Sequence, residues 1–428
     1  MVGGERKPRR VEVDRSEGFG ERLLGVLLDR AHEMPPQMIA PLIAEEVAGI
    51  GGRDVSILLQ DYEQMLLVPL PGRRLVVGDP EPIEDSPAGD AFLYARAVEV
   101  DQDDGGVRIY MPLLDGSDQV GAMSVTLDEV DDDDRRLLRR LAGLVADMIV
   151  TKNAYTDQFF VARRRAPMSL AAEIQWSLLP PLAMFVPQVE VAGILEPAYA
   201  AAGDSFDYAL NDDLLHVGMI DAMGHGLDAA TMATVAIGAY RHARRAAIDL
   251  AQVYAFMDQA IDEQFGPDHF VTAQMMRLDI TTGHLQWVNA GHPAPLLIRG
   301  LTVVDRLESP STLPVGFGGD TPAVSELMLR RGDRVLCFTD GLIEEHRGKG
   351  ELFGEEQLIH WTNHIMGQNP TVRAATRALS HALKRERGGL TSDDATLFLF
   401  EWRGGDADHL AVFDDRSSRQ AEGGPEGT

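Results

Sequence analysis

The order of apolar and polar positions predicts helices followed by strands in the first part of the chain. Two helix-like stretches come first, and the second, "PPQMIAPLIAEEVAGIGG", opens with prolines and closes with glycines. The apolar residues of the first stretch are Leu23, Leu24, Leu27 and Leu28. Strand-like runs follow in "DVSILLQDYEQMLLVPL" and in "VRIYMPLLDGSDQVGAMSVTL", where Asp115-Gly116-Ser117 is a hairpin signal. We therefore expect two helices and then an antiparallel sheet.

A long helix is expected to leave this sheet through "DDDDRRLLRRLAGLVADMIV". Asp131 to Asp134 suit the positive N-terminal end of such a helix. Its apolar residues fall on one stripe, formed by Leu137, Leu141, Leu144, Val145 and Met148. We expect the helix to continue through "TKNAYTDQFFVARRRAP" until Pro167 interrupts it.

A second, short amphipathic helix is predicted in "SLAAEIQWSLLPP", with Ser169 as its N-cap and two prolines as its stop. The spacing i, i+4, i+8 places Leu170, Ile174 and Leu178 on one face. Two interpretations stay open. The segment is a helix that simply packs on the following domain, or it is a coupling helix that carries the state of the first part into the second.

From Val189 to Trp402 strands and helices are mixed, which indicates an α+β domain with a large antiparallel component. The strand-like runs are "VEVAGIL", "SFDYAL", "LLHVGMI", "TAQMMRLDI", "LQWVNA", "RVLCFT" and "DATLFLFEW". The helical stretches are 227–246, 249–265, 355–366 and 371–386.

Composition limits what this protein can be. The 428 residues are 45% hydrophobic and 25% charged, which suits a globular protein of two or three domains. Cys337 is the only cysteine and cannot form an internal disulfide, and no N-terminal apolar segment is typical of a signal peptide, so we expect a cytoplasmic protein. No stretch of about twenty residues lacks charge, so no membrane span is expected. A net charge of −28 argues against nucleic-acid binding.

Four aspartates stand where strand-like runs meet turns: Asp204, Asp221, Asp340 and Asp393. If they converge, each close pair repels by about 4 kcal/mol at an effective dielectric near 20, so cations must be present. Carboxylate, carbonyl and water oxygens suit Mg²⁺ or Mn²⁺, whereas zinc favours histidine and cysteine. Taken one at a time, each is better explained as an ordinary turn aspartate.

The motifs around these aspartates resemble those of a known family in the right order. "GDSFD", "IDAMGHGLDAA", "VNAGHPAPLLI", "LRRGDRVLCFTDGLIEE", "ELFGEEQL" and "SDDATL" are similar to motifs of the PPM-type (protein phosphatase 2C-like) serine/threonine phosphatases, in the branch named after SpoIIE and RsbU. The resemblance covers about half the chain, and "AAEIQWSLLPP" resembles the helix that leads into this branch's catalytic domain. It implies an αββα sandwich with a metal cluster at one end of two packed sheets. The first part of the chain resembles a GAF sensor domain in its pattern of elements.

Carried over by position, the resemblance implies two Mn²⁺ or Mg²⁺ ions bridged by Asp221. Asp204 and the Ala222 carbonyl complete the protein ligands of one ion, and Asp340 with Asp393 complete those of the other. A water activated between the ions would then hydrolyse phosphoserine or phosphothreonine.

The histidines and remaining acids near these motifs are weaker candidates. His225 is a candidate general acid, with a helix-entry turn as its alternative role. His292 is expected to hold a loop. Asp207, Asp394 and Glu344 are expected to be supporting or turn residues rather than metal ligands.

The expected organisation has five regions. They are a disordered leader over 1–18, a GAF-like α/β sensor domain over 19–150, coupling helices over 151–188, a PPM-type phosphatase domain over 189–403 and a disordered tail over 404–428. The resemblance implies a phosphorylated STAS-type anti-sigma-factor antagonist as substrate, under control of the sensor domain. The apolar stripe of the long helix makes a homodimer through the sensor and coupling helices plausible. The alternative function is an inactive sensor-scaffold that only binds a phosphoprotein.

Three other classes of site fit the sequence less well. Gly224 to Ala229 match G-x-G-x-x-A, but a dinucleotide site would need a second strand ending in an acidic residue about twenty positions on. A cysteine phosphatase would need arginine six positions after Cys337, where Ile343 stands. A P-loop would need "GK[ST]", which does not occur.

Overall fold

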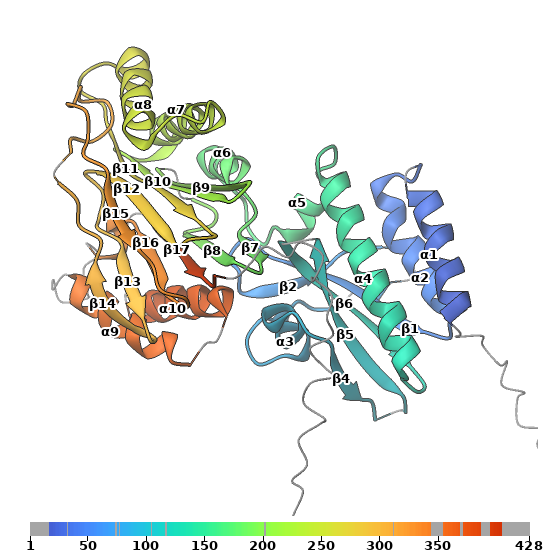
Figure 1. The fold of residues 1–428 in the computed structure, drawn as a ribbon. Helices are drawn as coiled ribbons and strands as arrows, with labels where there is room; N and C mark the ends of the chain where they lie inside the picture. Colours follow the sequence, from blue (N-terminus) through green and yellow to red (C-terminus); the bar gives the residue numbers. More distant parts are fainter. Residues whose placement is uncertain are drawn as a thin grey trace, which may run out of the picture.

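The computed structural model describes residues 17–31, 33–72, 75–76, 78–103, 105–115, 118–200, 203–310, 312–343, 354–368, 371–386 and 394–404. These residues form three antiparallel sheets with helices packed on them (Figure 1). Of the leader predicted over 1–18 and the tail predicted over 404–428, residues 1–16 and 405–428 lie outside the described residues, whereas Glu17 and Gly18 belong to the first helix rather than to a disordered leader. None of the helices within the described segments is long and apolar enough to cross a membrane.

Sheet 1 belongs to the first part of the chain and has the strand order β3-β2-β1-β6-β5-β4. Its strands are β1 Arg53–Gln60, β2 Leu66–Pro69, β3 Glu81–Pro82, β4 Val98–Asp101, β5 Val107–Asp115 and β6 Asp118–Leu127. The main core lies between one face of this sheet and α1 (Glu17–Ala31), α2 (Ile39–Gly49) and α4 (Asp132–Asn153). A short 3₁₀ turn, Pro36–Met38, precedes α2. The other face carries α3 (Pro87–Tyr94). The helix–sheet–helix order expected here is present, and the GAF-like sensor assignment stays a prediction.

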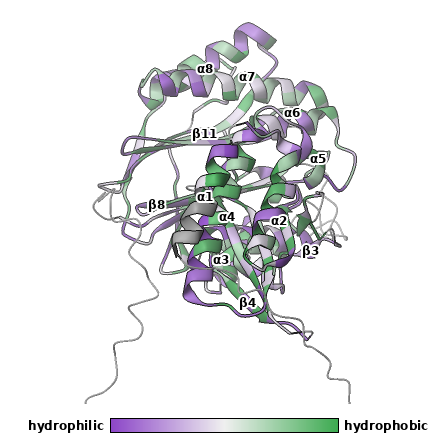
Figure 2. Ribbon diagram, turned by 90° about the vertical axis from the view of Figure 1, so that its right-hand side faces the viewer, coloured by the Kyte–Doolittle hydropathy of each residue, from purple (hydrophilic) through white to green (hydrophobic). Residues whose placement is uncertain are grey.

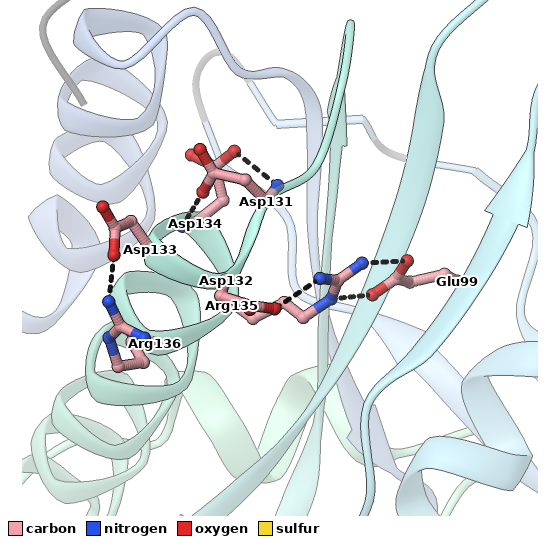
Figure 3. Close-up of polar contacts among 7 residues, drawn as sticks. All are labelled: Glu99, Asp131, Asp132, Asp133, Asp134, Arg135 and Arg136. Carbon is pink, nitrogen blue, oxygen red and sulfur yellow. Dashed lines mark hydrogen bonds and ion pairs between the residues drawn. The ribbon is translucent and has the colours of Figure 1, made fainter. Parts of the chain in front are cut away.

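The N-terminus of α4 explains why the chain starts a helix at this point (Figure 3). The main-chain N–H of Asp134 donates to Asp131 Oδ1 over 2.8 Å, and the N–H of Asp131 donates back to Asp134 Oδ2 over 3.2 Å. This reciprocal pair is a capping box, which gives hydrogen-bond acceptors to two N–H groups that have none within the helix. Arg135 then holds the helix to the sheet, because its guanidinium binds both carboxylate oxygens of Glu99 on β4.

The prediction that this helix continues to Pro167 is wrong. Helix α4 ends at Asn153, and a separate short helix, α5, spans Gln158–Arg163. The hydroxyl of Thr156 accepts the main-chain N–H of Gln158 over 3.2 Å. Such a local side-chain bond competes with the helical hydrogen bond and favours a new helix start.

The second part of the chain is an αββα sandwich, as predicted. Sheet 2 has the order β15-β12-β11-β10-β9, and sheet 3 has the order β14-β13-β16-β17-β8-β7. Helices α7 (Gly226–Arg245) and α8 (Leu250–Phe265) cover sheet 2, and helices α9 (Gly354–Met366) and α10 (Val372–Glu386) cover sheet 3 on the opposite side (Figure 1). A further apolar core fills the space between the two sheets.

The strands of the sandwich have the following bounds. Sheet 2 contains β9 Asp204–Asn211, β10 Leu214–Ala222, β11 Val271–Asp279, β12 His284–Ala290 and β15 Ser325–Met328. Sheet 3 contains β7 Ala183–Val186, β8 Val189–Glu196, β13 Leu296–Arg299, β14 Thr302–Arg306, β16 Arg334–Phe338 and β17 Ala395–Trp402.

Burial on both faces explains the continuous apolar runs of the central strands. Every residue of β8 and of β16 is buried, because one face meets sheet 2 and the other meets α9 and α10. In Figure 2 the covering helices, such as α1 and α8, carry both hydrophobic and hydrophilic residues. This is expected of helices with one face on a core and the other on solvent.

The alanine-rich sequence of α7 lets this helix lie close to sheet 2. Ala229, Ala233 and Ala236 are buried, and the ring of Tyr240 lies over Gly218 of β10. A Cβ atom on Gly218 would lie 2.9 Å from the Tyr240 ring, so this position must be glycine for the helix to sit at this distance.

Helix α6, Leu170–Leu178, starts as predicted but buries a different face. Ser169 caps it by accepting the Ala172 N–H over 3.1 Å. The predicted apolar stripe is wrong, because Leu170 is 63% exposed and the other two residues of the stripe are only partly buried. The buried residues are Ala171, Ala172 and Gln175. Small side chains on this face allow α6 to pack closely on α7, where Ala171 meets Ala230.

The two parts of the chain pack directly against each other through α10. The guanidinium of Arg373 donates to Gln119 Oε1 over 2.6 Å and to Gln60 Oε1 over 3.1 Å. One turn later, Arg377 Nε donates to the carbonyl of Gln64 over 2.6 Å. Helix α10 therefore joins sheet 3 to sheet 1, a contact that no local sequence pattern indicated.

Candidate metal centre

Asp204 and Asp221 meet at one end of sheet 2. Strand β9 begins at Asp204 and β10 ends at Ala222, and the antiparallel register places Asp204 directly opposite Asp221. The Ala222 N–H donates to the carbonyl of Gly203 over 3.2 Å. A Cβ atom on Gly203 would lie 2.8 Å from the Ala222 carbonyl oxygen, so glycine keeps that oxygen uncrowded.

Two threonines from sheet 3 hold the Asp204 carboxylate. Asp204 is 2% exposed, and its Oδ2 accepts the hydroxyls of Thr339 over 2.6 Å and Thr396 over 2.7 Å. The Thr396 N–H in turn donates to the Thr339 hydroxyl over 2.9 Å, which orients that hydroxyl. Sequence reasoning missed both threonines, although each lies inside a quoted motif, "FTDG" and "DDAT".

Electrostatics make this carboxylate costly to ionise. Burial raises the pKa of Asp204 well above its ordinary value, and the negative charges of Asp221 and Asp394 raise it further. The threonine hydrogen bonds act in the opposite direction. A divalent cation at this place would offset both the burial and the repulsion. Because the donors are carboxylate and carbonyl oxygens, the residues present suit Mg²⁺ or Mn²⁺.

Asp394 approaches the same place from the start of β17. Its Oδ2 accepts the main-chain N–H groups of Gly203 over 2.7 Å and of Asp204 over 3.1 Å. The side chain therefore supports the chain that carries Asp204, in line with its expected supporting role. Its neighbour Asp393, a predicted metal ligand, lies outside the described residues.

Asp340 enters the site region from β16. It opens a 3₁₀ turn, Asp340–Leu342, immediately after Thr339, and it is partly exposed. Since Thr339 binds Asp204, the fold brings Asp340 to the end of the sandwich where Asp204 and Asp221 meet. Among the described residues, no group of three or more His, Cys, Asp or Glu side chains is arranged to hold a metal ion. The metal assignment therefore rests on the Asp204–Asp221 pair and its oxygen-rich surroundings.

The two candidate histidines have different settings. His225 is the exposed N-cap residue of α7 and makes no capping hydrogen bond with its side chain. His292 is buried, and its Nδ1 lies 2.9 Å from the Thr272 hydroxyl. Burial lowers the pKa of His292 to about 3, so its ring is neutral. The Asn289 side chain donates to the His292 carbonyl and accepts the His292 N–H, which folds the loop after β12, and the His292 ring ties this loop to Thr272 on β11, as expected for a loop-holding residue.

Asp207 fastens α7 to sheet 2 instead of facing the acidic pair. It is buried on β9 and forms ion pairs with Arg241 over 2.7 Å and Arg244 over 2.6 Å. These arginines lie three residues apart on α7 and so share a face of the helix. That spacing was the available sequence signal for this contact.

The comparisons with known proteins concern the second part of the chain. Residues 211–403 match the family model described as stage II sporulation protein E (SpoIIE). This region is thus similar to the SpoIIE family. The phosphoserine phosphatase RsbP of Bacillus subtilis is 25% identical over 194 residues, which cover 44% of this chain and 47% of RsbP. Protein IcfG of Synechocystis is 23% identical over 227 residues, which cover 46% of this chain and 35% of IcfG. The chain thus spans about half or less of the length of these relatives.

Solved structures similar to this chain include two bacterial proteins. The RsbU and RsbW domains of Rv1364c from Mycobacterium tuberculosis are 28% identical, with a TM-score of 0.45, covering 52% of this chain and 62% of that one. The SiaA-PP2C domain of Pseudomonas aeruginosa is 22% identical, with a TM-score of 0.47, covering 54% of this chain and 94% of that one.

Two of the rival sites are excluded by the SpoIIE-type domain's own geometry. Strand β10, which precedes the glycines of "GHGLDA", is antiparallel to both β9 and β11, so the parallel β-α-β unit of a dinucleotide site is not formed there. Cys337 is buried in β16, and burial raises its pKa to about 12. A protonated, buried thiol cannot serve as a phosphatase nucleophile.

Proposed function

We propose that this protein is a metal-dependent protein phosphatase that hydrolyses phosphoserine or phosphothreonine on a regulatory protein. One observation carries the proposal: Asp221, inside the region that matches the SpoIIE family, faces Asp204, which lies just before that region, across β9 and β10, and two threonines fix the orientation of Asp204. A sheet retains such a like-charged pair at a cost in stability, which a bound cation would offset.

Two Mn²⁺ or Mg²⁺ ions are part of this proposal. Asp221 would bridge them, with Asp204 and the Ala222 carbonyl on one ion and Asp340 with Asp393 on the other. When bound, such ions would neutralise phosphoryl charge and acidify a water molecule.

The chain's own residues prepare the place for the ions. Thr339 and Thr396 both donate to Oδ2 of Asp204, which fixes the plane of the carboxylate. Gly203 keeps a Cβ atom away from the Ala222 carbonyl oxygen, which such an atom would approach to 2.8 Å. His225 remains a candidate general acid, since it is exposed at the start of α7, four residues after Asp221.

The substrate and its regulation are the finer parts of the proposal. We infer a phosphorylated STAS-type anti-sigma-factor antagonist as substrate, supported by the family match and by the similarity to RsbP, whose name states a phosphoserine phosphatase. We infer control by the first part of the chain, a GAF-like sensor, supported by its direct contacts with α10. Homodimerisation and a cytoplasmic location belong to the same proposal; the latter rests on the single cysteine of the sequence.

A phosphatase assay on the full chain tests the function. The protein is incubated with p-nitrophenyl phosphate and with a panel of phosphoproteins that includes phosphorylated STAS proteins, first with Mn²⁺ and then with EDTA. We expect turnover with Mn²⁺, loss of turnover with EDTA, and loss in Asp221→Asn but not in Asp213→Asn, an exposed acid in the turn between β9 and β10. Binding of a phosphoprotein without turnover would instead support the inactive sensor-scaffold.

A further inference from the structure

We propose that Gln175 of α6 is a positioning residue for the acidic site, and that Tyr62 in the first part of the chain sets its position through Trp176. The inference rests on the proposed function, because it assigns the regulation of that same site.

Gln175 reaches both strands that carry the site. Its side-chain Nε2 donates to the main-chain carbonyl of Asp204 over 2.5 Å and lies 3.4 Å from Asp394 Oδ2. Asp394 Oδ2 also accepts the N–H groups of Gly203 and Asp204. One amide group therefore ties the start of β9 in sheet 2 to the start of β17 in sheet 3.

The acceptor end of the Gln175 amide takes no part in this contact. Gln175 is 1% exposed, and its Oε1 is buried with no hydrogen-bond partner among the residues that the structure describes. A buried acceptor without a partner lowers stability, so an apolar side chain would suit the packing of α6 on α7 better. The donor end of the amide is the part that the site uses.

The next residue of α6 is in contact with the first part of the chain. The Trp176 ring lies edge-on to the Tyr62 ring, with centroids 4.7 Å apart, and its Nε1 donates to the Ala198 carbonyl over 2.7 Å. Tyr62 lies in the turn between β1 and β2 and also meets the ring of Tyr199, at 6.4 Å. Ala198 and Tyr199 belong to the loop that leads from β8 to Gly203.

Tyr62 is held firmly enough to transmit a displacement. It is 2% exposed, and the Arg163 guanidinium of α5 lies 4.8 Å from its ring centre while Arg163 Nε donates to the carbonyl of Gln60. A shift of the β1–β2 turn would therefore move Trp176 and the loop after β8 together. Gln175, one residue before Trp176, would move relative to Asp204. Coupling of this kind requires two arrangements of α6 that differ little in free energy.

The first experiment replaces the donor and keeps the side-chain length. Gln175→Met is compared with Gln259→Met, in which the glutamine is exposed on α8. Mn²⁺ binding is measured by calorimetry on the full chain, and kcat/KM is measured on p-nitrophenyl phosphate. We expect Gln175→Met to weaken Mn²⁺ binding about 10- to 100-fold, the usual effect of removing a residue that orients a metal ligand. Gln259→Met should bind as the wild type does.

The second experiment tests the contact across the two parts. Tyr62→Leu should weaken Mn²⁺ binding in the same direction as Gln175→Met, whereas Tyr62→Phe, which keeps the ring, should match the wild type. The effects of Tyr62→Leu and Gln175→Met should not add in the double variant, because both act through α6. Thermal unfolding and circular dichroism identify any variant that has lost its fold, and Trp176→Phe then replaces Tyr62→Leu.

The outcomes separate this inference from the proposed function. A wild type without Mn²⁺-dependent turnover contradicts the proposed phosphatase, and Mn²⁺ binding then still tests Gln175. A wild type that is active, with Gln175→Met equal to it in both Mn²⁺ affinity and kcat/KM, shows that the positioning role is wrong. Full additivity of Tyr62→Leu and Gln175→Met shows that the part assigned to Tyr62 is wrong.

Discussion

Asp204 and Asp221 occupy directly opposed positions in the register between β9 and β10. Opposed residues have Cβ atoms about 4.5–5.5 Å apart, and like charges at such a pair destabilise a sheet. Thr339 and Thr396 hold Asp204 in this position, although burial and Asp221 both oppose its ionisation. Two acidic side chains are therefore held close together at one end of the sandwich. A cation that bound between them would relieve their repulsion.

Removing one of the two charges should stabilise the metal-free protein. We expect Asp221→Asn to raise the melting temperature in EDTA, because a close like-charged pair costs up to about 4 kcal/mol at an effective dielectric near 20, and less for a partly exposed residue. Mn²⁺ should then add no further stability. Thermal unfolding with and without Mn²⁺ measures both effects, with Asp213→Asn as the control. A lower melting temperature of Asp221→Asn in EDTA would contradict the repulsion.

Gly203 should not tolerate a side chain. In Gly203→Ala the new Cβ would lie 2.8 Å from the Ala222 carbonyl oxygen, so that main-chain group must move. We expect a loss of about 1–3 kcal/mol in the free energy of unfolding, together with weaker Mn²⁺ binding. The control is Gly238→Ala in α7, where a Cβ meets nothing within 4 Å and helix propensity favours alanine by about 0.5–1 kcal/mol. Denaturant unfolding compares the two variants.

Removing a threonine hydroxyl that holds Asp204 should weaken metal binding, although the change in the side chain is small. Thr396→Val keeps the shape of the side chain but removes the hydroxyl that donates to Asp204. Hydrogen bonds to charged groups contribute about 1.5–3 kcal/mol, and loss of an orienting partner weakens metal binding about 10- to 100-fold. Calorimetry with Mn²⁺ measures the change against Thr231→Val, whose hydroxyl only binds a carbonyl within α7. Equal Mn²⁺ affinities would show that Asp204 needs no such support.

His381 should make the protein less stable in acid. Burial, and then the charge of Arg377, lower the pKa of His381 to about 4, while Glu84, 3.5 Å away, acts in the opposite direction. In the unfolded chain the pKa is near 6.5, so between pH 6.5 and 4 the unfolded state binds more protons. The free energy of unfolding therefore falls as the pH falls through this window, by roughly 3 kcal/mol at most, since one pKa unit corresponds to about 1.4 kcal/mol.

Unfolding curves between pH 7 and 4 measure the effect of His381. His381→Leu should flatten the dependence on pH, and His360→Leu, at an exposed position on α9, should not. His381 and Arg377 both face Glu84, in the segment between β3 and α3, so this titration takes place at the contact between the two parts of the chain. An unchanged slope in His381→Leu would place the acid sensitivity elsewhere.

A substitution of His225 tests whether this residue only forms the turn into α7 or acts as a general acid. As the exposed N-cap of α7 it lies between two glycines with positive φ, Gly224 and Gly226, which suits a tight helix entry. We expect His225→Asn to leave kcat within a few fold, because asparagine is also a good N-cap. Loss of a general acid would instead lower kcat about 10²- to 10⁴-fold. The assay is turnover of a phosphoprotein across a range of pH.

Local sequence patterns were sufficient to predict the elements that are fully buried or that begin with a strong helix cap. The buried runs of β8 and β16, the hairpin between β5 and β6, and the capped start of α4 all follow from residues close together in sequence. The αββα arrangement came from motif resemblance, and the packing of three apolar layers confirms it. Short strands such as β7 and β14 escaped prediction because four or five residues carry too little periodicity.

Sequence by itself also determined that aspartates stand at strand ends, since a carboxylate next to glycine after an apolar run is visible without a structure. Only the tertiary structure decided which groups meet them. Thr339 and Thr396 reach Asp204 from another sheet, and Gln175 reaches it from a helix whose buried face the leucine spacing mispredicted. Partners that lie from 29 to 192 residues apart in sequence leave no periodic signal. Their contacts depend on how closely small residues let a helix approach a sheet, and that distance is set by the packing of the whole core.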